Sequence, residues 1–242
     1  MAEPTITLNV TRYRPGQDQA PTTQTYAVPY KEDWVVLDAL NHIKDQIDGT
    51  LSYRWSCRMG VCGSCGMMVN GEPKLSCETF LRDLYPGPVR VEALNHFPIV
   101  RDLVIEQSDF LRKLESVKPY LIAEEASPGK TFLQTPRQME DYYQYSKCIN
   151  CLLCYAACPQ YGLNDKFTGP AALALLHRYN ADSRDAGKAE RMELVNAEDG
   201  VWGCTLVGYC SEVCPKEVDP ARAINQNKIN STKDYFFRFF RK

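Results

Sequence analysis

The 242-residue sequence lacks several features that would place it in common functional classes. No apolar run approaches the roughly 18 residues that cross a bilayer, and the N-terminus, Met-Ala-Glu-Pro, lacks the basic and apolar regions of a secretion signal. The sequence contains neither a G-x-G-x-x-G motif nor a P-loop, and it shows no clear pairing of a nucleophile with a base. We therefore expect no membrane span, a reducing compartment and no catalytic residues in this chain.

A strong excess of either charge is also missing. The 28 Lys and Arg residues nearly balance the 30 Asp and Glu residues, which gives a formal net charge of -2 and a pI of about 6.0. Such a surface offers nothing that would favour a polyanion, so we expect no nucleic-acid partner. The length is enough for one large or two small domains with a sizeable core.

Cysteine, by contrast, is abundant. The 11 cysteines stand in tight groups with metal-ligand spacings, unlike the scattered cysteines of a disulfide framework. The three histidines, His42, His96 and His177, lie outside these groups. This separation disfavours a Rieske-type or zinc role for histidine.

One group organises the rest of the chain. Cys148, Cys151, Cys154 and Cys158, followed by Pro159, have the spacing C-x2-C-x2-C-x3-C-P. In this iron–sulfur motif three closely spaced thiolates hold one cluster, while the fourth cysteine binds a different cluster. The motif therefore requires a second cluster elsewhere in the chain.

The second half of the pair lies downstream. Cys204, Cys210 and Cys214-Pro215 repeat the same spacing, with Val207 where the second cysteine would stand. Valine offers no thiolate to iron. If the two halves exchange their last ligands, one site has four thiolates and the other has three. We therefore predict a 4Fe-4S cluster on Cys148, Cys151, Cys154 and Cys214, and a 3Fe-4S cluster on Cys158, Cys204 and Cys210.

A third group precedes these two. Cys57, Cys62, Cys65 and Cys77 follow the plant-type 2Fe-2S spacing of four residues, two residues and a longer gap. Glycines between the ligands allow the backbone to wrap closely and to aim N–H groups at the sulfides. Asn70-Gly71 predicts a type I′ hairpin turn before the strand that delivers the last ligand.

The residues before the boundary near position 100 are rich in predicted strands. Apolar and polar residues alternate from Thr5 to Tyr13, and a second strand is predicted over Thr25–Val28. Apolar residues then recur at helical spacing over 36–47, with Asp33 available near the helix N-terminus. The predicted order of elements is therefore a pair of strands followed by a helix.

The pattern from residue 101 onward is helical. Thr135-Pro136 predicts an N-cap followed by proline at the first helical position, and further helices open at Pro170 and Pro220, the last leading to residue 228. The charged stretch Asp182–Glu193 is interpreted as a solvated helical face. The tail, 235–242, mixes aromatic and basic side chains, which fits either docking to a membrane partner or lipid headgroups, or coverage of the domain's own core.

The three cysteine motifs together, in this order and in a chain of this size, resemble the iron–sulfur subunit of the succinate dehydrogenase/fumarate reductase family. All 11 cysteines match the ligand pattern of that family. The resemblance implies an α+β chain with a β-grasp, plant-type 2Fe-2S ferredoxin domain at 1–100. An α-helical ferredoxin domain with the 4Fe-4S and 3Fe-4S clusters would follow at 101–242.

The resemblance also implies partners. They are a catalytic subunit that contains FAD, integral membrane anchor subunits and a quinone, with the chain held peripherally at the cytoplasmic face of a bacterial inner membrane. Arg54 and Arg58 would pair with acidic residues of the flavoprotein, tune the first cluster or remain solvated. The segment Asn225, Gln226, Asn227 and Lys228 matches a quinone-contacting segment of similar bacterial fumarate reductases, with an ordinary solvated lysine as the alternative.

Two local features favour menaquinol:fumarate reductase over succinate:quinone dehydrogenase. Cys158-Pro-Gln-Tyr-Gly162 differs from the Cys-Pro-Ser-x-Trp typical of ubiquinone-linked succinate dehydrogenases, and Thr205 stands where bacterial succinate dehydrogenases carry His. Direction itself depends on reduction potentials. A soluble polyferredoxin and a zinc-stabilised structural protein remain as alternatives from other classes.

Overall fold

The computed structural model describes residues 4–123 and 132–240. The chain divides into two compact units, the first made of Met1–Gln107 with Ile149–Ala157 and the second of Ser108–Cys148 with Cys158–Lys242. The predicted domain boundary at residue 100 falls inside the last hairpin of the first unit and stays a prediction. None of the described helices is both long enough and apolar enough to span a membrane.

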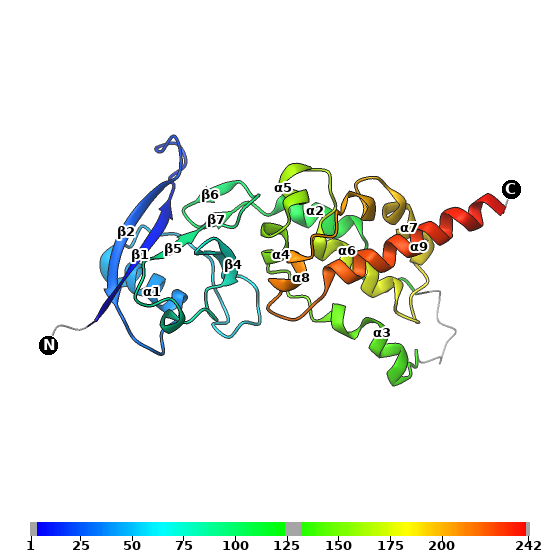
Figure 1. The fold of residues 1–242 in the computed structure, drawn as a ribbon, viewed down its shortest axis with the longest axis horizontal. Coiled ribbons are helices and arrows are strands. Elements are labelled where there is room, and N and C mark those ends of the chain that lie inside the picture. Colours follow the sequence, from blue (N-terminus) through cyan, green and yellow to red (C-terminus); the bar gives the residue numbers. More distant parts are fainter. Residues whose placement is uncertain (1–3, 124–131, 241–242) are drawn as a thin grey trace. The chain divides into compact units, whose positions relative to one another are not determined.

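The first unit is built on a mixed five-stranded sheet with the order β2-β1-β5-β3-β4. Figure 1 labels β1, β2, β4 and β5 of this sheet. β1 pairs with β2 antiparallel and with β5 parallel, and β3 pairs antiparallel with both β4 and β5. The predicted first hairpin and the β-grasp arrangement are confirmed. The strands are β1 (Thr5–Arg12), β2 (Thr22–Pro29), β3 (Gly66–Val69), β4 (Glu72–Leu75) and β5 (Val89–Glu92).

A helix packs against this sheet, because its apolar residues share one face. α1 (Val36–His42) continues as the π-helical turn η1 (Ile43–Ile47), and a 3-10 turn η2 (Leu81–Asp83) follows β4. The N-cap is Val35, whose N–H is accepted by Asp38 at 3.1 Å, so the expectation of a role for Asp33 is wrong. The core of this unit contains the fully buried Leu8, Val28, Leu40, Val89 and Val91.

The prediction that helical structure begins at residue 101 is also wrong. β6 (Ile99–Arg101) and β7 (Val104–Ile105) form a hairpin, and α2 begins only at Ser108. The cause is Asp102, which takes a positive φ of 47°. Its buried carboxylate accepts hydrogen bonds from Arg12 Nε (3.0 Å) and from the backbone N–H groups of Tyr13 (3.0 Å) and Ser52 (2.9 Å). These long-range bonds hold the hairpin in the first unit.

The second unit is helical, and α6 lies at its centre. This apolar helix packs against α2, α3, α7 and α9, and its buried residues include Leu173, Ala174 and Leu176. The helices are α2 (Ser108–Ser116), α3 (Pro136–Ser146), α5 (Pro159–Leu163), α6 (Pro170–Asn180), α7 (Lys188–Asn196), η3 (Val201–Gly203), α8 (Tyr209–Glu212) and α9 (Pro220–Phe240). The short α4 (Leu153–Ala156) belongs to the first unit.

The charged stretch Asp182–Glu193 is only partly a solvated face, because Lys188, Glu190 and Glu193 are exposed whereas other charged members are buried. Asp182 and Arg191 are only 3% and 1% exposed. Arg184 Nη2 lies 2.8 Å from the Asp182 carboxylate, and Arg191 Nη1 lies 2.6 Å from that of Asp185. The hydrogen bond from Arg184 holds the pKa of Asp182 below its usual range. Charge alone could not reveal that these residues pair internally.

The predicted cap of α3 is confirmed. Thr135 accepts a hydrogen bond from the Gln138 N–H (3.3 Å) and donates its own N–H to the Gln138 side chain (2.9 Å), which completes a capping box. Thr135→Ala is expected to lower the opening free energy of the first turn of α3 by about 1 kcal/mol. Hydrogen exchange of the backbone amides in this first turn measures the change in opening free energy. Thr135→Ser keeps the hydroxyl and should behave as the parent; equal loss in both variants contradicts the cap.

Candidate metal centres

The first group of cysteines lies on a loop and a hairpin of the first unit. Cys57 and Cys62 are on the loop before β3, Cys65 directly precedes β3, and Cys77 follows β4. The hairpin turn at Asn70-Gly71 has positive φ at both residues (51° and 85°), as the type I′ prediction requires. It brings the Cys65 and Cys77 sulfurs to 3.2 Å. Two candidate ligands that are distant in sequence thus meet because of a turn that the sequence predicts.

Backbone N–H groups point at the sulfurs of this loop. Cys57 Sγ accepts from the N–H groups of Val61 (3.2 Å), Cys62 (3.3 Å) and Met59 (3.5 Å), and Cys77 Sγ accepts from Gly60 N–H (3.3 Å). Such donors stabilise negative charge on thiolate sulfur. The loop therefore fits a group that binds through thiolates and carries net negative charge.

The thiol pKa values reflect two different surroundings. The hydroxyl of Ser64 and nearby N–H groups lower the pKa of Cys62 to about 6. Burial, followed by the neighbouring Cys65, raises the pKa of Cys77 to about 12. A buried thiol of this kind loses its proton when a metal cation supplies the compensating charge. Metal binding at Cys77 would thus be coupled to loss of the thiol proton.

Glycine allows this loop to touch the next ligand segment closely. Gly63 has a φ of +73°, and a Cβ there would lie 2.8 Å from the Ile149 carbonyl oxygen and 3.0 Å from Cys151 Cα. A Cβ on Gly66 would lie 2.9 Å from the Cys151 carbonyl oxygen. These residues all belong to the first unit. The candidate ligand Cys151 is thereby brought against the loop of the first group.

The remaining candidates for the 4Fe-4S site are divided between the two units. Cys151 and Cys154 belong to the first unit, and Cys154 is buried on α4. Cys148 and Cys214 belong to the second unit, where both pack on the same hydrophobic cluster. Two of these cysteines therefore belong to each unit, and their joint role as ligands stays a prediction. The cluster beneath Cys148 and Cys214 consists of Tyr145, Ala174, Val218 and Ala223.

The internal repeat seen in the sequence is also a repeat of backbone conformation. Asn150 (φ 53°) and Leu152 (φ 68°) flank Cys151 with left-handed geometry, and Leu206 (φ 58°) and Gly208 (φ 87°) flank Val207 in the same way. A four-residue helix follows in each copy, α4 in the first and α8 in the second. Val207 therefore occupies the local position of a ligand without having a thiol.

Three thiols come together in the second unit. Cys158 precedes α5, Cys204 follows η3, and Cys210 lies on α8. Burial, together with the charges of Cys158 and Cys204, raises the pKa of Cys210 to about 12. Burial, together with Cys204, also raises the pKa of Cys158. Neighbouring cysteines contribute to both pKa shifts, which is consistent with the predicted three-thiolate site.

The metal assignment itself rests on spacing and on these donors. Within residues 4–123 and 132–240, no group of three or more His, Cys, Asp or Glu side chains is arranged to hold a single metal ion. The 11 cysteines are all free of disulfides, which leaves every predicted thiol available. The ligand sets therefore stay predictions.

The four predicted quinone-contacting residues have different surroundings on α9. Asn225 and Gln226 are exposed. Asn227 is fully buried, with its side-chain oxygen 3.4 Å from His177 Nδ1. Lys228 is half-buried and donates a hydrogen bond of 2.7 Å to the Cys204 carbonyl oxygen. The side chain of Lys228 thus lies beside the third site, whereas Asn227 faces α6.

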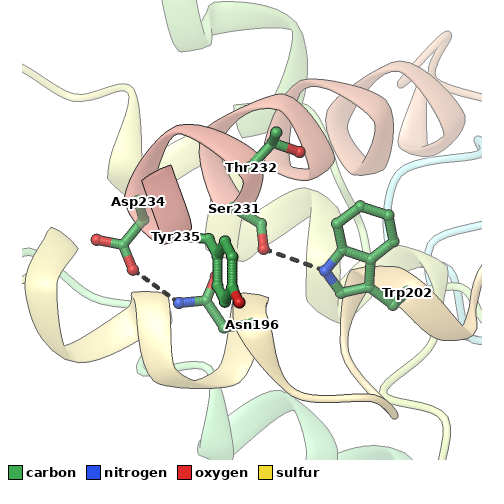
Figure 2. Close-up of a pocket in the computed structure, with 6 residues that line it drawn as sticks. All are labelled: Asn196, Trp202, Ser231, Thr232, Asp234 and Tyr235. Atoms are coloured by element: carbon green, nitrogen blue, oxygen red, sulfur yellow. Dashed lines mark hydrogen bonds between the residues drawn. The ribbon is translucent and has the colours of Figure 1, made fainter. Parts of the chain in front are cut away.

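A pocket that sequence reasoning missed lies between α7, η3 and α9, with a volume of about 380 Å³. Trp202 Nε1 donates to Ser231 Oγ at 3.1 Å, and Asn196 Nδ2 donates to the Asp234 carboxylate at 2.8 Å (Figure 2). These contacts join residues far apart in the sequence, so no local motif could reveal them. The lining residues are Asn196, Trp202, Ser231, Thr232, Asp234 and Tyr235.

Two exposed surfaces accompany the candidate centres. Around the first group, Trp55, Met59 and Val61 are 41%, 70% and 57% exposed, and the Arg58 guanidinium lies 4.4 Å from the Trp55 ring centroid. On the last turns of α9, Tyr235, Phe236 and Phe237 are 79%, 58% and 60% exposed. These three aromatics of the tail do not cover the core of their own unit; the side chains of residues 238–240 and all of residues 241–242 lie outside the described part.

Comparisons with known proteins agree with the two-part arrangement. A family described as "2Fe-2S iron-sulfur cluster binding domain" matches residues 7–112, and one described as "4Fe-4S dicluster domain" matches residues 140–215. A chain of the "Mycobacterium smegmatis Sdh1 complex in the apo form" has a TM-score of 0.87 with this chain at 26% identity, covering 97% of this chain and 98% of that one.

Curated relatives cover nearly the full length. The fumarate reductase iron-sulfur subunit of Haemophilus influenzae is 58% identical over 96% of this chain and 95% of its own length. The corresponding subunit of Escherichia coli O6:H1 is 58% identical over 95% and 94%. The succinate dehydrogenase iron-sulfur subunit of Coxiella burnetii is 37% identical over 91% and 94%. The chain therefore belongs to the family of iron–sulfur subunits of fumarate reductases and succinate dehydrogenases.

Proposed function

We propose that this chain relays electrons within a membrane-bound menaquinol:fumarate reductase, between a quinol and the FAD of a catalytic subunit. The observation that carries the proposal is the 58% identity of this chain to curated fumarate reductase iron-sulfur subunits, in a sequence whose 11 cysteines all fall within the three predicted ligand motifs. The absence of a nucleophile–base pair or nucleotide motif in the sequence agrees with a subunit that conducts electrons for chemistry carried out elsewhere.

Three clusters would supply one-electron redox steps in series when bound. Cys57, Cys62, Cys65 and Cys77 would hold 2Fe-2S; Cys148, Cys151, Cys154 and Cys214 would hold 4Fe-4S; Cys158, Cys204 and Cys210 would hold 3Fe-4S. The close contact of Gly63 with Cys151 supports this order, because it brings backbone from the first ligand set against the second. The N–H groups aimed at Cys57 and Cys77 would stabilise the negative charge of the first site.

The exposed surface around the first ligand set supports docking of the flavin-bearing subunit. Trp55, Met59 and Val61 offer apolar area next to the cation of Arg58, a combination common at the centre of protein interfaces. Arg58 would then meet acidic residues of the flavoprotein, with Arg54 nearby in sequence. Integral anchor subunits would hold the second unit at the cytoplasmic face of the bacterial inner membrane, where the exposed Tyr235, Phe236 and Phe237 provide aromatic docking area.

Lys228 is proposed to contact a quinone at the interface with the anchor subunits, with the exposed Asn225 and Gln226 on the same helix. An ammonium group has three donors, and the bond to Cys204 uses one of them. Lys228→Leu is expected to lower quinone turnover at least tenfold while dye reduction by the complex persists. Lys233→Leu, a change at an exposed lysine of α9, is the control. Equal loss of both activities in Lys228→Leu contradicts a quinone role.

Succinate oxidation is the second candidate direction. The relative from Coxiella burnetii, named a succinate dehydrogenase subunit, is 37% identical, and the same three clusters serve both reactions. Thr205, and the residues Pro-Gln-Tyr-Gly after Cys158, favour fumarate reductase. The direction depends on the reduction potentials of the redox centres, because a difference of about 59 mV in a one-electron step changes the equilibrium constant tenfold.

Purification from native membranes tests the proposal. The complex should contain a flavin-bearing subunit and membrane subunits, with about nine iron atoms per chain for the three clusters, and it should reduce fumarate with menaquinol analogues faster than it oxidises succinate. Faster succinate oxidation favours the dehydrogenase. A free, coloured monomer indicates a soluble polyferredoxin, and a colourless protein indicates a zinc-stabilised structural protein.

A further inference from the structure

A carboxylate lies against the backbone of the first candidate site. Gly60 stands between Cys57 and Cys62 in the sequence, is buried, and donates its N–H to Cys77 Sγ at 3.3 Å. Its φ is +65°, and a Cβ at this position would overlap the carboxylate of Glu78, whose Oε2 would lie 2.7 Å away. The Glu78 side chain therefore fills the space that the glycine leaves open, directly beside an N–H donor of the site.

The turn after β4 fixes the backbone of Glu78. The N–H of Glu78 donates to the Leu75 carbonyl oxygen at 3.0 Å, and the Thr79 hydroxyl donates to the same oxygen at 2.9 Å. Within the described part of the chain, no lysine or arginine forms an ion pair with the Glu78 carboxylate. A negative charge that no described cation neutralises is thus held next to the backbone that carries the N–H donor.

A charge at this position affects the electron affinity of the first site. An N–H group that points at thiolate sulfur stabilises added negative charge and raises the reduction potential. A carboxylate against the same backbone has the opposite effect, because it repels the charge that reduction adds. Glu78 is exposed, so solvent weakens this repulsion. The path from the carboxylate through Gly60 to Cys77 Sγ is nevertheless no longer than the roughly 8 Å over which physiological salt screens charge.

We propose that Glu78 lowers the reduction potential of the 2Fe-2S cluster of the first site, by holding a fixed negative charge against Gly60. This inference rests on the electron relay proposed above. A lower potential at this site favours passage of the electron onward to a flavin, which suits a chain that delivers electrons towards fumarate. Glu78 thus modulates the site without being one of its ligands.

The test is a redox titration of the purified complex, in which electron paramagnetic resonance follows the 2Fe-2S signal. Glu78→Gln removes the charge and keeps the size of the side chain. At a fixed ambient potential its reduced-to-oxidised ratio should rise at least twofold, which is about 18 mV for one electron. Glu78→Lys reverses the charge and should raise the ratio at least fourfold, which is about 36 mV. Glu78→Asp keeps the charge and should shift the ratio less than Glu78→Gln does.

Glu72→Gln is the matched control. Glu72 is an exposed carboxylate at the opposite end of β4, next to the hairpin turn, where it pairs with Lys74 at 2.8 Å. The potential in this variant should equal that of the parent, and a shift equal to that of Glu78→Gln contradicts a local effect. Equal shifts in Glu78→Gln and Glu78→Asp would assign the effect to packing and overturn the inference.

The parent complex separates this inference from the proposed relay. A parent without a 2Fe-2S signal overturns the proposed cluster and this inference together. A normal parent signal whose potential is unchanged in both Glu78→Gln and Glu78→Lys overturns this inference alone.

Discussion

Val207→Cys is expected to convert the third cluster from 3Fe-4S to 4Fe-4S and to lower its reduction potential. The residues flanking Val207, Leu206 and Gly208, have the same left-handed φ as Asn150 and Leu152 around Cys151. A cysteine at position 207 would therefore point its thiolate as Cys151 does in the other copy of the motif. The fourth thiolate supplies the missing ligand for a fourth iron and adds negative charge, which favours the oxidised state.

Electron paramagnetic resonance and iron analysis measure this change in the purified complex. The signal of the oxidised 3Fe-4S cluster should fall by at least tenfold, and iron should rise by about one atom per chain, as one more ligand to a four-iron cluster requires. Val207→Ala opens space without adding a thiolate and should keep the parent signal. A full-intensity 3Fe-4S signal in Val207→Cys means that residue 207 does not stand at the position of the missing fourth ligand. Slower electron transfer is the expected functional consequence.

Sequence reasoning succeeded where the determining interactions are local. The Asn70-Gly71 turn and the Thr135 cap follow from short-range preferences, and the structure has both. The repeat around Cys151 and Val207 was recognised from local spacing, whereas the left-handed φ values that accompany it were not predicted. The three cysteine motifs can be recognised in the sequence for the same reason, because ligand spacing is a local constraint.

Errors arose where long-range contacts override local pattern. Arg12, distant in sequence, fixes Asp102 and keeps the residues after 100 in a hairpin. Arg191 pairs with Asp185 in the interior, so part of the charged stretch is buried. The last helix runs to Phe240, well beyond the predicted residue 228. The bond from Lys228 to Cys204 has no signature in the sequence for the same reason.

Gly63→Ala is expected to disrupt the approach of the first ligand loop to Cys151. A methyl group at Gly63 would lie 2.8 Å from the Ile149 carbonyl oxygen and 3.0 Å from Cys151 Cα, and backbone atoms at these distances cannot yield by rotating a side chain. The left-handed φ of +73° adds roughly 1–2 kcal/mol, and overpacking adds about 1–3 kcal/mol. The loop around Gly63 and the segment around Cys151 should both become less ordered. The first and second clusters should then both have lower occupancy.

Gly16→Ala is the matched control for backbone strain. Gly16 has a similar φ of +77°, but a Cβ there meets no atom within 4 Å, so this variant carries the strain of roughly 1–2 kcal/mol without the clash. In complexes purified in parallel, Gly63→Ala should show at least a twofold loss of the 2Fe-2S signal and slower reduction of the second cluster from the flavin side, while Gly16→Ala keeps both. Equal behaviour of the two variants would assign the effect to φ alone. The close contact between Gly63 and Cys151 would then not be needed for electron transfer between the first two sites.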